Sequence, residues 1–119
     1  MDRDNRPNGL IAWQWSLYPD GHGDHVNLIL HLLTVPLFWA GTVAIPLALW
    51  RGPWWLALAG FFAMVAAIVV QGRGHRRETT EPVPFRGPLD VAARLFVEQW
   101  FTFPRYVLTG ALARRWRGP

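Results

Sequence analysis

The sequence predicts an all-α fold, in which an integral membrane helical hairpin of two spans precedes interfacial amphipathic helices near the C-terminus. Residues 28–50 and 54–70 form two apolar runs without a formal charge, and a membrane-spanning helix needs about 20 such residues. Arg51-Gly52-Pro53 between them is typical of a tight connection. The later segment 89–116 mixes charged and apolar side chains, so we expect it to lie along a membrane surface.

Composition restricts the chain to one domain and restricts its chemistry. A length of 119 residues predicts a single membrane domain, 1–119, and 51% hydrophobic residues with eight Trp and seven Phe is rich for a soluble protein of this size. Cysteine is absent. This excludes disulfides, thiolate catalysis and Cys-ligated zinc or iron–sulfur centres, so any metal must be held by nitrogen and oxygen.

All twelve basic residues are arginine, and the sequence pI is about 11.0. These arginines alternate with Leu, Val, Phe and Trp, a pattern that favours anionic lipid headgroups and argues against nucleic acid as the partner.

The distribution of charge predicts how the chain is oriented. The polar N-terminus carries both charge signs and lacks the features of a signal peptide, so the first span is expected to insert as a signal anchor. Arg73, Arg76, Arg77 and Arg86 follow the second span, whereas the connection carries Arg51 alone. Because cytoplasmic loops carry the excess of arginine, we expect both termini and the polar clusters to face the cytoplasm.

Polar residues begin and end the two spans. Pro19-Asp20-Gly21 is a turn signal, which places His22 on a loop, and Asp24 is the expected N-cap of a helix that starts near His25. On that helix Asn27 and His31 are four residues apart and share a face.

The second span is followed by a similar cluster and then by shorter elements. Gln71, His75 and Glu78 share a face if the helix persists that far. Residues 79–88 contain three prolines and are expected to form a loop. Residues 89–103 are expected to form an amphipathic helix that Pro104 ends, and residues 106–116 a second interfacial piece.

An antiparallel hairpin would bring His22, His31 and His75 to one membrane face. Ionisable groups there are costly unless they serve a function, and imidazole with carboxylate is a ligand set for iron, zinc, copper or manganese. Glu78 stays open between a metal ligand, a general base and a surface ion pair. Asn27 and Gln71 either orient the histidines or satisfy free backbone groups at the helix ends.

Two strings, YPDGHGDHVNLILHLLTVPLF and QGRGHRRETTEPVPF, resemble the membrane family that includes the fungal 2-hydroxy fatty acid dioxygenase. A third string, FVEQWFTFPRYVLTG, resembles a stretch in bacterial relatives without an assigned activity. The resemblance covers residues 18–110. The residues that match the family's first two motifs are Tyr18, His22, Asn27, His31 and Pro36, then Gln71, Gly74 and His75.

The resemblance implies an Fe(II)-dependent dioxygenase that uses O2 to shorten 2-hydroxy fatty acids by one carbon with release of CO2, in the bacterial inner membrane. Zinc or another divalent metal is also compatible with the residues. The three histidines would hold the metal, Tyr18, Asn27 and Gln71 would support them, and Glu78 would be a ligand or base. An arginine such as Arg76 would clamp the substrate carboxylate, and the acyl chain would lie between the spans.

Two alternatives remain at this point. One is a small non-enzymatic membrane protein whose histidines and arginines bind metal or lipid headgroups. The other, haem held by His31 and His75, is less favoured because both residues lie at the membrane boundary.

Overall fold

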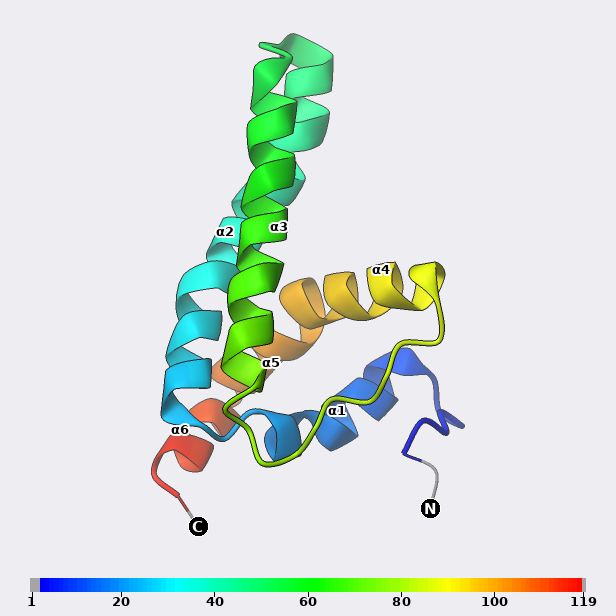
Figure 1. Ribbon diagram of the computed structural model, residues 1–119, viewed down its shortest axis with the longest axis vertical. Coiled ribbons are helices and arrows are strands. Elements are labelled where there is room, and N and C mark those ends of the chain that lie inside the picture. Colours follow the sequence, from blue (N-terminus) through cyan, green and yellow to red (C-terminus); the bar gives the residue numbers. More distant parts are fainter. Residues whose placement is uncertain (1–2, 119) are drawn as a thin grey trace.

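The structure is a computed structural model that describes residues 3–118. Within this range the secondary structure consists of helices (Figure 1). Two long helices form a tall pair, and shorter helices pack around one end of it. In chain order the elements are α1 (Leu10–Gly21), α2 (His25–Arg51), α3 (Trp55–His75), α4 (Pro88–Val97), the π-helical turn η1 (Glu98–Thr102), α5 (Phe103–Leu108) and α6 (Ala111–Trp116).

The helices α2 and α3 lie side by side and are joined at the top of the molecule in Figure 1. Both are long and apolar enough to cross a membrane, by length and composition. Their backbones approach closely at two glycines: a Cβ added to Gly60 would lie 2.8 Å from the carbonyl oxygen of Gly41. Small residues at such a crossing allow close backbone packing of apolar helices.

The start of α2 confirms the predicted N-cap. The Asp24 side chain accepts a hydrogen bond from the Asn27 N–H at 3.0 Å, and the helix begins at His25. Pro36 and Pro46 lie inside α2 without ending it. At the other end of the pair, α3 continues beyond the predicted apolar run to His75.

The hydrophobic core lies below the exposed part of the pair, where α1, α2 and α5 meet. Its buried members are Tyr18, Leu28, Val35, Phe103 and Tyr106. Segments distant in sequence therefore converge around the lower end of α2.

The prediction of a turn at Pro19-Asp20-Gly21 is wrong. These residues are the last helical residues of α1, a helix that was not predicted from the sequence. Packing explains the difference. Trp13 and Tyr18 on this helix are buried, and the His22 N–H bonds back to the carbonyl of Pro19. Burial of this face keeps the segment helical, so the turn residues end the helix instead of preventing it.

Pro104 does not end a helix as predicted, because the chain stays helical from α4 through η1 into α5. In η1 the Phe103 N–H bonds to the carbonyl of Glu98, five residues back. In that register Pro104, which has no N–H, faces the carbonyl of Gln99. The Trp39 indole N–H donates to this carbonyl at 2.6 Å and satisfies it.

The segment expected to be a second interfacial piece, residues 106–116, contains the end of α5 and the whole of α6. Gly110 has a φ of 81° and separates α5 from α6. A left-handed residue cannot continue a right-handed helix, and glycine adopts that conformation without steric cost.

Candidate metal centre

Four side chains from different elements converge at the lower end of the pair. His22 lies between α1 and α2, His31 on α2, His75 at the end of α3, and Glu98 is the first residue of η1. Each offers one ligand atom, and these atoms all lie within 4.8 Å of one another, a group that could hold a metal ion. The structure thus brings together the three histidines that the sequence analysis selected and adds Glu98, which it had not selected.

Two of the histidines are oriented by the main chain in the same way. Nδ1 of His22 lies 2.9 Å from the carbonyl oxygen of Tyr18, and Nδ1 of His31 lies 2.9 Å from that of Asn27. A carbonyl oxygen only accepts hydrogen bonds, so each Nδ1 carries a proton. In a neutral ring Nε2 is then left with a free lone pair, the form that binds metals.

These lone pairs face a carboxylate. Nε2 of His22 lies 3.2 Å from Oε2 of Glu98, and Nε2 of His31 lies 3.4 Å from the same oxygen. A lone pair opposite a carboxylate oxygen is repulsive unless a cation lies between them or the ring is protonated. The geometry therefore requires either a shared cation or an imidazolium–carboxylate pair.

Glu98 is held as an anion in this position. Burial alone would raise its pKa, but hydrogen bonds from His22 and His31 in the imidazolium form, and the charge of those rings, outweigh burial and hold the pKa well below its usual range. A bound cation would act in the same direction. The Tyr18 hydroxyl donates to Glu98 Oε2 at 2.8 Å, and the Tyr18 ring stacks on His22 with centroids 3.6 Å apart. Burial, together with the charge of Glu98, raises the pKa of Tyr18 well above its usual value, so this hydroxyl keeps its proton.

His75 completes the group from α3. Its ring is nearly perpendicular to those of His22 and His31, at 87° and 90°. Three buried side-chain atoms among the described residues form no hydrogen bond: Oδ1 of Asn27, Nδ1 of His75, and Nε2 of His31, which has only the Glu98 oxygen at 3.4 Å beside it. An unsatisfied buried polar atom costs about 1–3 kcal/mol. Two such atoms beside a carboxylate fit a divalent metal ion, and the nitrogen and oxygen donors suit iron, zinc or manganese.

Asn27 supports the site through its backbone, and its side chain points elsewhere. Its carbonyl orients His31, whereas its Nδ2 donates to Glu78 at 2.7 Å. The Asn27 side chain packs directly against Gly74, where an added Cβ would collide with the amide. The glycine before His75 therefore lets α3 approach α2 at this level.

Gln71 does not contact His75 through a hydrogen bond; it forms an amide pair one turn of α3 closer to the α2–α3 connection than the site. Gln71 and Gln99 exchange two hydrogen bonds, of 3.0 and 2.7 Å, and Gln71 also donates to Thr34 at 2.9 Å. All three side chains are buried. This network joins α3 and α2 to η1 and so holds Glu98, the neighbour of Gln99, in place.

Glu78 lies outside the converging group. Its carboxylate accepts hydrogen bonds from the backbone N–H groups of Gly23 and Asp24 at 3.0–3.2 Å. Since α3 ends at His75, Glu78 leaves the helix face that the sequence analysis assumed and fixes the α1–α2 connection instead. Arg76, the predicted carboxylate clamp, is exposed and does not line the neighbouring cavity.

One sequence signal could have identified Glu98. Glu98 and Gln99 form a polar pair within an otherwise largely apolar stretch, and the sequence analysis assigned such charges to a membrane surface. The π-helical turn that begins at Glu98 has no comparable signature, yet such turns occur often at functional sites.

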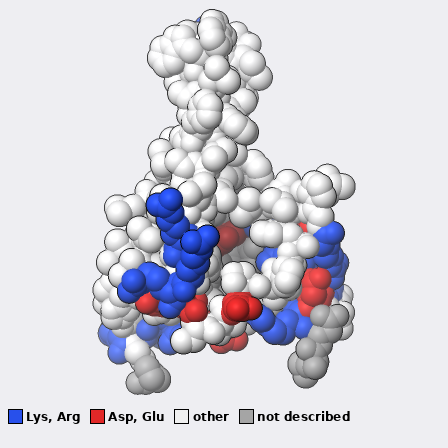
Figure 2. Space-filling view, viewed as in Figure 1, with Lys and Arg blue, Asp and Glu red and all other residues white. Residues whose placement is uncertain are grey.

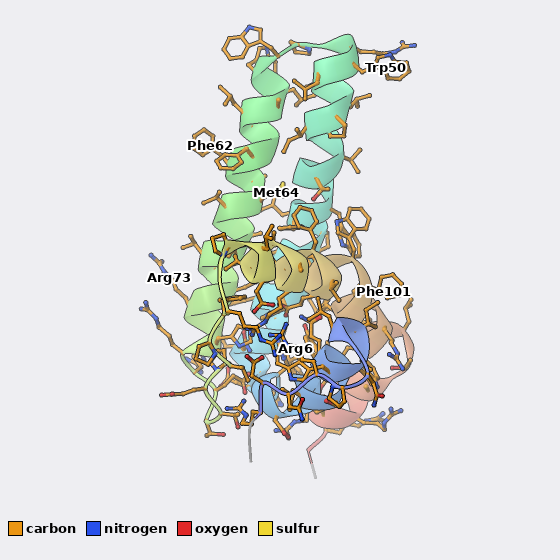
Figure 3. All side chains as sticks on the ribbon, turned by 90° about the vertical axis from the view of Figure 1, so that its right-hand side faces the viewer. Arg6, Trp50, Phe62, Met64, Arg73 and Phe101 are labelled. Carbon is orange, nitrogen blue, oxygen red and sulfur yellow. The ribbon has the colours of Figure 1, made fainter. Side chains whose placement is uncertain are left out.

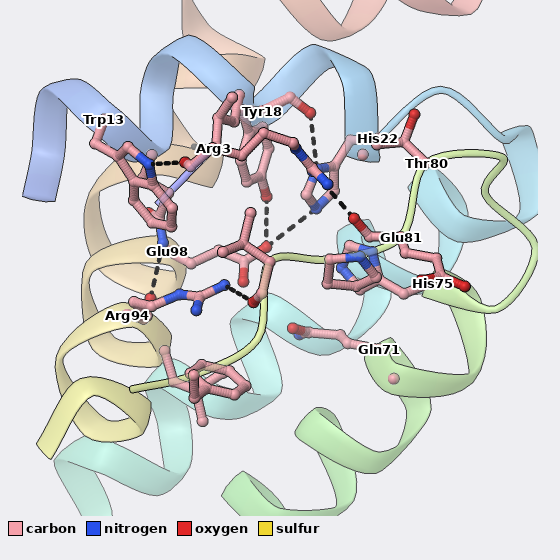
Figure 4. Close-up of a pocket in the computed structure, with 18 of the residues that line it drawn as sticks. Arg3, Trp13, Tyr18, His22, Gln71, His75, Thr80, Glu81, Arg94 and Glu98 are labelled. Carbon is pink, nitrogen blue, oxygen red and sulfur yellow. Dashed lines mark hydrogen bonds and ion pairs between the residues drawn. The ribbon is translucent and has the colours of Figure 1, made fainter. Parts of the chain in front are cut away.

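A cavity of about 280 Å³ adjoins the group (Figure 4). His22, His75 and Glu98 form its polar end. Arg94 lies on the same side as Glu98, across from His75, and donates to the carbonyl of Val83 at 2.8 Å, in the segment that crosses the cavity. The apolar lining comes mainly from Leu17, Ile68, Val83, Phe85 and Leu95.

No family model matches this chain, and searches of curated proteins and of solved structures found no match. The fold and the site therefore define the class of protein. It is a helical protein with a candidate His₃Glu metal centre beside a cavity and with two helices long and apolar enough to cross a membrane.

Proposed function

We propose that this protein is a membrane-embedded non-haem Fe(II) oxygenase that shortens a 2-hydroxy fatty acid, or a similar lipid, by one carbon. The observation that carries the proposal is the converging group of three histidines and Glu98, in which imidazole nitrogens face a carboxylate. Two histidines and one carboxylate are the ligand set of many non-haem Fe(II) oxygenases. The sequence resemblance to the family of the fungal dioxygenase supports the same chemistry.

The exposed surface of the long pair supports a membrane location. Trp50 is 75% exposed and Phe62 is 64% exposed, and both project outward from the pair (Figure 3). On the face in Figure 2, charged side chains gather around the lower half of the molecule, and the upper part of the pair is almost free of them. Soluble monomers rarely expose apolar surface on this scale.

The polar and apolar faces of α4 are reversed relative to those of a surface helix in a water-soluble protein. Its Asp90 and Arg94 side chains are only 10% and 11% exposed, whereas Leu89 is 87% exposed. Phe101 in η1 and Leu108 in α5 continue the exposed apolar face. A helix with charges turned inward and apolar residues outward fits the interface of a bilayer, which supports the interfacial placement of α4 to α5.

The proposed reaction balances without an external reductant. A 2-hydroxy acid, R–CH(OH)–COOH, reacts with O2 to give R–COOH, CO2 and water. The C1–C2, C2–H and O–O bonds break, one oxygen atom of O2 joins C2, and the other leaves in water, so the four electrons lost by C1 and C2 reduce O2. Bound iron would supply the binding and reduction of O2, and the hydroxyl and carboxylate oxygens of the substrate suit a divalent cation.

The residues of the chain have separate roles in this proposal. The metal is held by His22, His31, His75 and Glu98. The hydroxyl of Tyr18 donates a hydrogen bond to the Glu98 carboxylate and so restricts its rotation. His31 has no exposed surface and His22 only 6%, so these two rings are shielded from bulk water, whereas the half-buried His75 and Glu98 face the cavity. The cavity beside it provides space for the substrate.

Metal analysis followed by product analysis tests the proposal. Protein purified without chelator is expected to hold about one iron per chain. With O2 it should convert a long-chain 2-hydroxy fatty acid into the acid one carbon shorter, as measured by mass spectrometry. His31→Ala should lose both properties and keep its helical content.

A non-enzymatic protein that binds metal or lipid headgroups is the competing proposal. The exposed Arg73 and Arg76 near the end of α3 favour it, since they suit anionic headgroups. Iron-loaded protein that leaves every 2-hydroxy acid intact in the presence of O2 would support this alternative.

A further inference from the structure

We infer that the cavity beside the metal group holds the hydrocarbon tail of a single-chain lipid, which enters sideways from the bilayer between α3 and α4, past Ile68 and Leu95. The head of that lipid reaches His75 and Glu98, and in this respect the inference rests on the proposed function. It replaces the expectation that the acyl chain lies between the two spans.

The space between α2 and α3 is closed. A Cβ added to Gly60 would meet the Gly41 carbonyl oxygen at 2.8 Å and the Ala44 Cβ at 3.0 Å. Ala67 on α3 and Phe38 on α2 are buried, with 0% and 2% exposure. Even a methyl group does not fit where the backbones touch, so an acyl chain cannot pass there.

The cavity on the other side of α3 changes from polar to apolar along its length. Ile68 precedes His75 by two turns of α3, about 10 Å along the axis towards the apolar end of the pair. Leu95 precedes Glu98 by one turn on α4. Gln71 lies between Ile68 and His75 on α3, but its amide group is hydrogen-bonded to Gln99 and Thr34. It therefore offers no unpaired polar group to a hydrocarbon chain.

Apolar surface continues from the cavity to the outside of the molecule. Val65, which precedes Ile68 by about one turn of α3, is 42% exposed, and Phe96 on α4 is 41% exposed. Figure 2 shows a hollow on this face, between the long pair and the α4 side. A lipid tail could therefore pass from the bilayer to the cavity without exposing its methylenes to water.

The side of the cavity away from the apolar surface is covered by the segment between α3 and α4. Arg3 donates to the carbonyl of Glu81 at 3.1 Å, and Arg94 donates to the carbonyls of Val83 and Pro84 at 2.8 and 3.2 Å. Pro82, Val83 and Phe85 of this segment line the cavity. These contacts hold the cover in place and leave the passage between α3 and α4 as the route for a lipid.

The size of the cavity selects one chain. Its volume of about 280 Å³ is just below the range of about 300–1,000 Å³ for small-molecule pockets. A two-chain phospholipid would need much more space, whereas one extended chain can place a segment inside and leave its end in the bilayer.

Binding of a spin-labelled lipid to the zinc-loaded protein tests the inference without turnover. The full chain is placed in lipid nanodiscs, and immobilisation of a doxyl-labelled long-chain 2-hydroxy fatty acid is measured by electron paramagnetic resonance. Ile68→Trp and Leu95→Trp fill the passage, and Val69→Trp and Ala93→Trp are matched controls because these neighbours do not line the cavity.

Wild type and both controls should bind the label equally. In the two passage variants, each methylene that no longer fits should weaken binding about fourfold. Exclusion of one to two methylenes should therefore weaken binding about tenfold in total, with zinc content unchanged. Ile68→Ala widens the passage and should admit a methyl-branched acid better than wild type does. This variant keeps the test decisive if a tryptophan variant fails to fold.

The outcomes separate this inference from the proposed chemistry. Zinc-loaded wild type that does not immobilise the label, or passage variants that bind as well as the controls, would overturn the lateral route. Normal binding of the label combined with an iron-loaded protein that leaves the acid intact would overturn the oxygenase and leave the lipid site standing. If no metal loads, the same comparison on metal-free protein decides the tail site alone.

Discussion

The two ends of the α2–α3 pair are built in opposite ways. Near the connection, large side chains such as Leu49 and Trp54 are 75% and 71% exposed, and the helices touch through Gly41 and Gly60. At the other end, Asn27, His31 and Gln99 have no exposed surface at all. Apolar groups thus face outward at one end, and polar groups face inward at the other.

The difference shows what each end must satisfy. The apolar end requires only surroundings that accept hydrocarbon. Each buried polar group at the other end requires a partner, because an unpaired one costs about 1–3 kcal/mol. The amide groups of Gln71 and Gln99 pair with each other, whereas Nε2 of His31 and Nδ1 of His75 have no such partner among the described residues. We interpret those two nitrogens as metal ligands.

The largest expected effect is all-or-none and concerns the side of the membrane on which each end lies. We predict that a periplasm-active reporter works when fused at Gly52 and fails after Pro119, because arginines concentrate at the site end of the pair. The reverse pattern would overturn the orientation. Activity at both positions would contradict the two-span arrangement.

The next largest effect distinguishes the two acidic residues. Glu98→Gln removes the negative charge that would balance a bound cation, so we expect the affinity for Fe(II) to fall by about 100-fold or more. Glu78→Gln is the matched control, since Glu78 binds backbone N–H groups outside the metal group. It should bind metal nearly as wild type does but unfold more easily. Metal titration decides, and equal loss in both variants would contradict the assigned roles.

The apolar end is tested through its glycines. Gly60→Ala should destabilise the protein by about 1–3 kcal/mol, because the new methyl group meets the Gly41 carbonyl and overpacks the crossing. Gly72→Ala on the same helix meets nothing within 4 Å and should be neutral or stabilising by up to about 1 kcal/mol. Denaturant titration in micelles measures both. Equal stability of the two variants would show that the helices do not touch at Gly60.

The amide pair at the polar end should show coupling between its members. Gln71→Leu and Gln99→Leu each leave a buried amide without its partner, so each should cost about 1–3 kcal/mol. The double variant should cost less than the sum of the two. Metal affinity should also fall by about tenfold in the single variants, since the pair holds η1 beside the site. Additive effects on the free energy of unfolding would mean that the pair does not form.

The smallest effect concerns the N-terminal segment, which is attached by charge. Arg6 donates to Asp90 at 2.6 Å, and this contact holds the pKa of Asp90 well below its usual value. The stabilisation is therefore fully present above about pH 4 and is lost as the pH falls below that value. The protection of the amides of residues 3–9, measured relative to the intrinsic exchange rate at each pH, should fall in acid, and Asp90→Asn should show the low protection already at pH 7. Protection that does not change with pH would contradict this attachment.

Local patterns in the sequence determined the parts of this protein that depend on near neighbours. The absence of charge predicted two long helices, and the position of Asp24 before an apolar run predicted the N-cap that the structure contains. An antiparallel pair by itself brings His31 near His75, because the start of one helix must lie beside the end of the next. Length, periodicity and capping are short-range properties, so they can be read without a structure.

Tertiary structure alone decided which acidic residue joins the histidines and where a substrate could lie. Glu78 is three residues from His75 in sequence, yet backbone N–H groups of the α1–α2 connection bind its carboxylate. Glu98 reaches the histidines because η1 packs against α1 and α2 and because the paired Gln71 and Gln99 hold that turn in place. Such contacts join segments that are far apart in the chain, and their energies depend on how several elements pack at once. No local pattern encodes that packing, so the choice of Glu98 over Glu78 and the position of the cavity required the folded molecule.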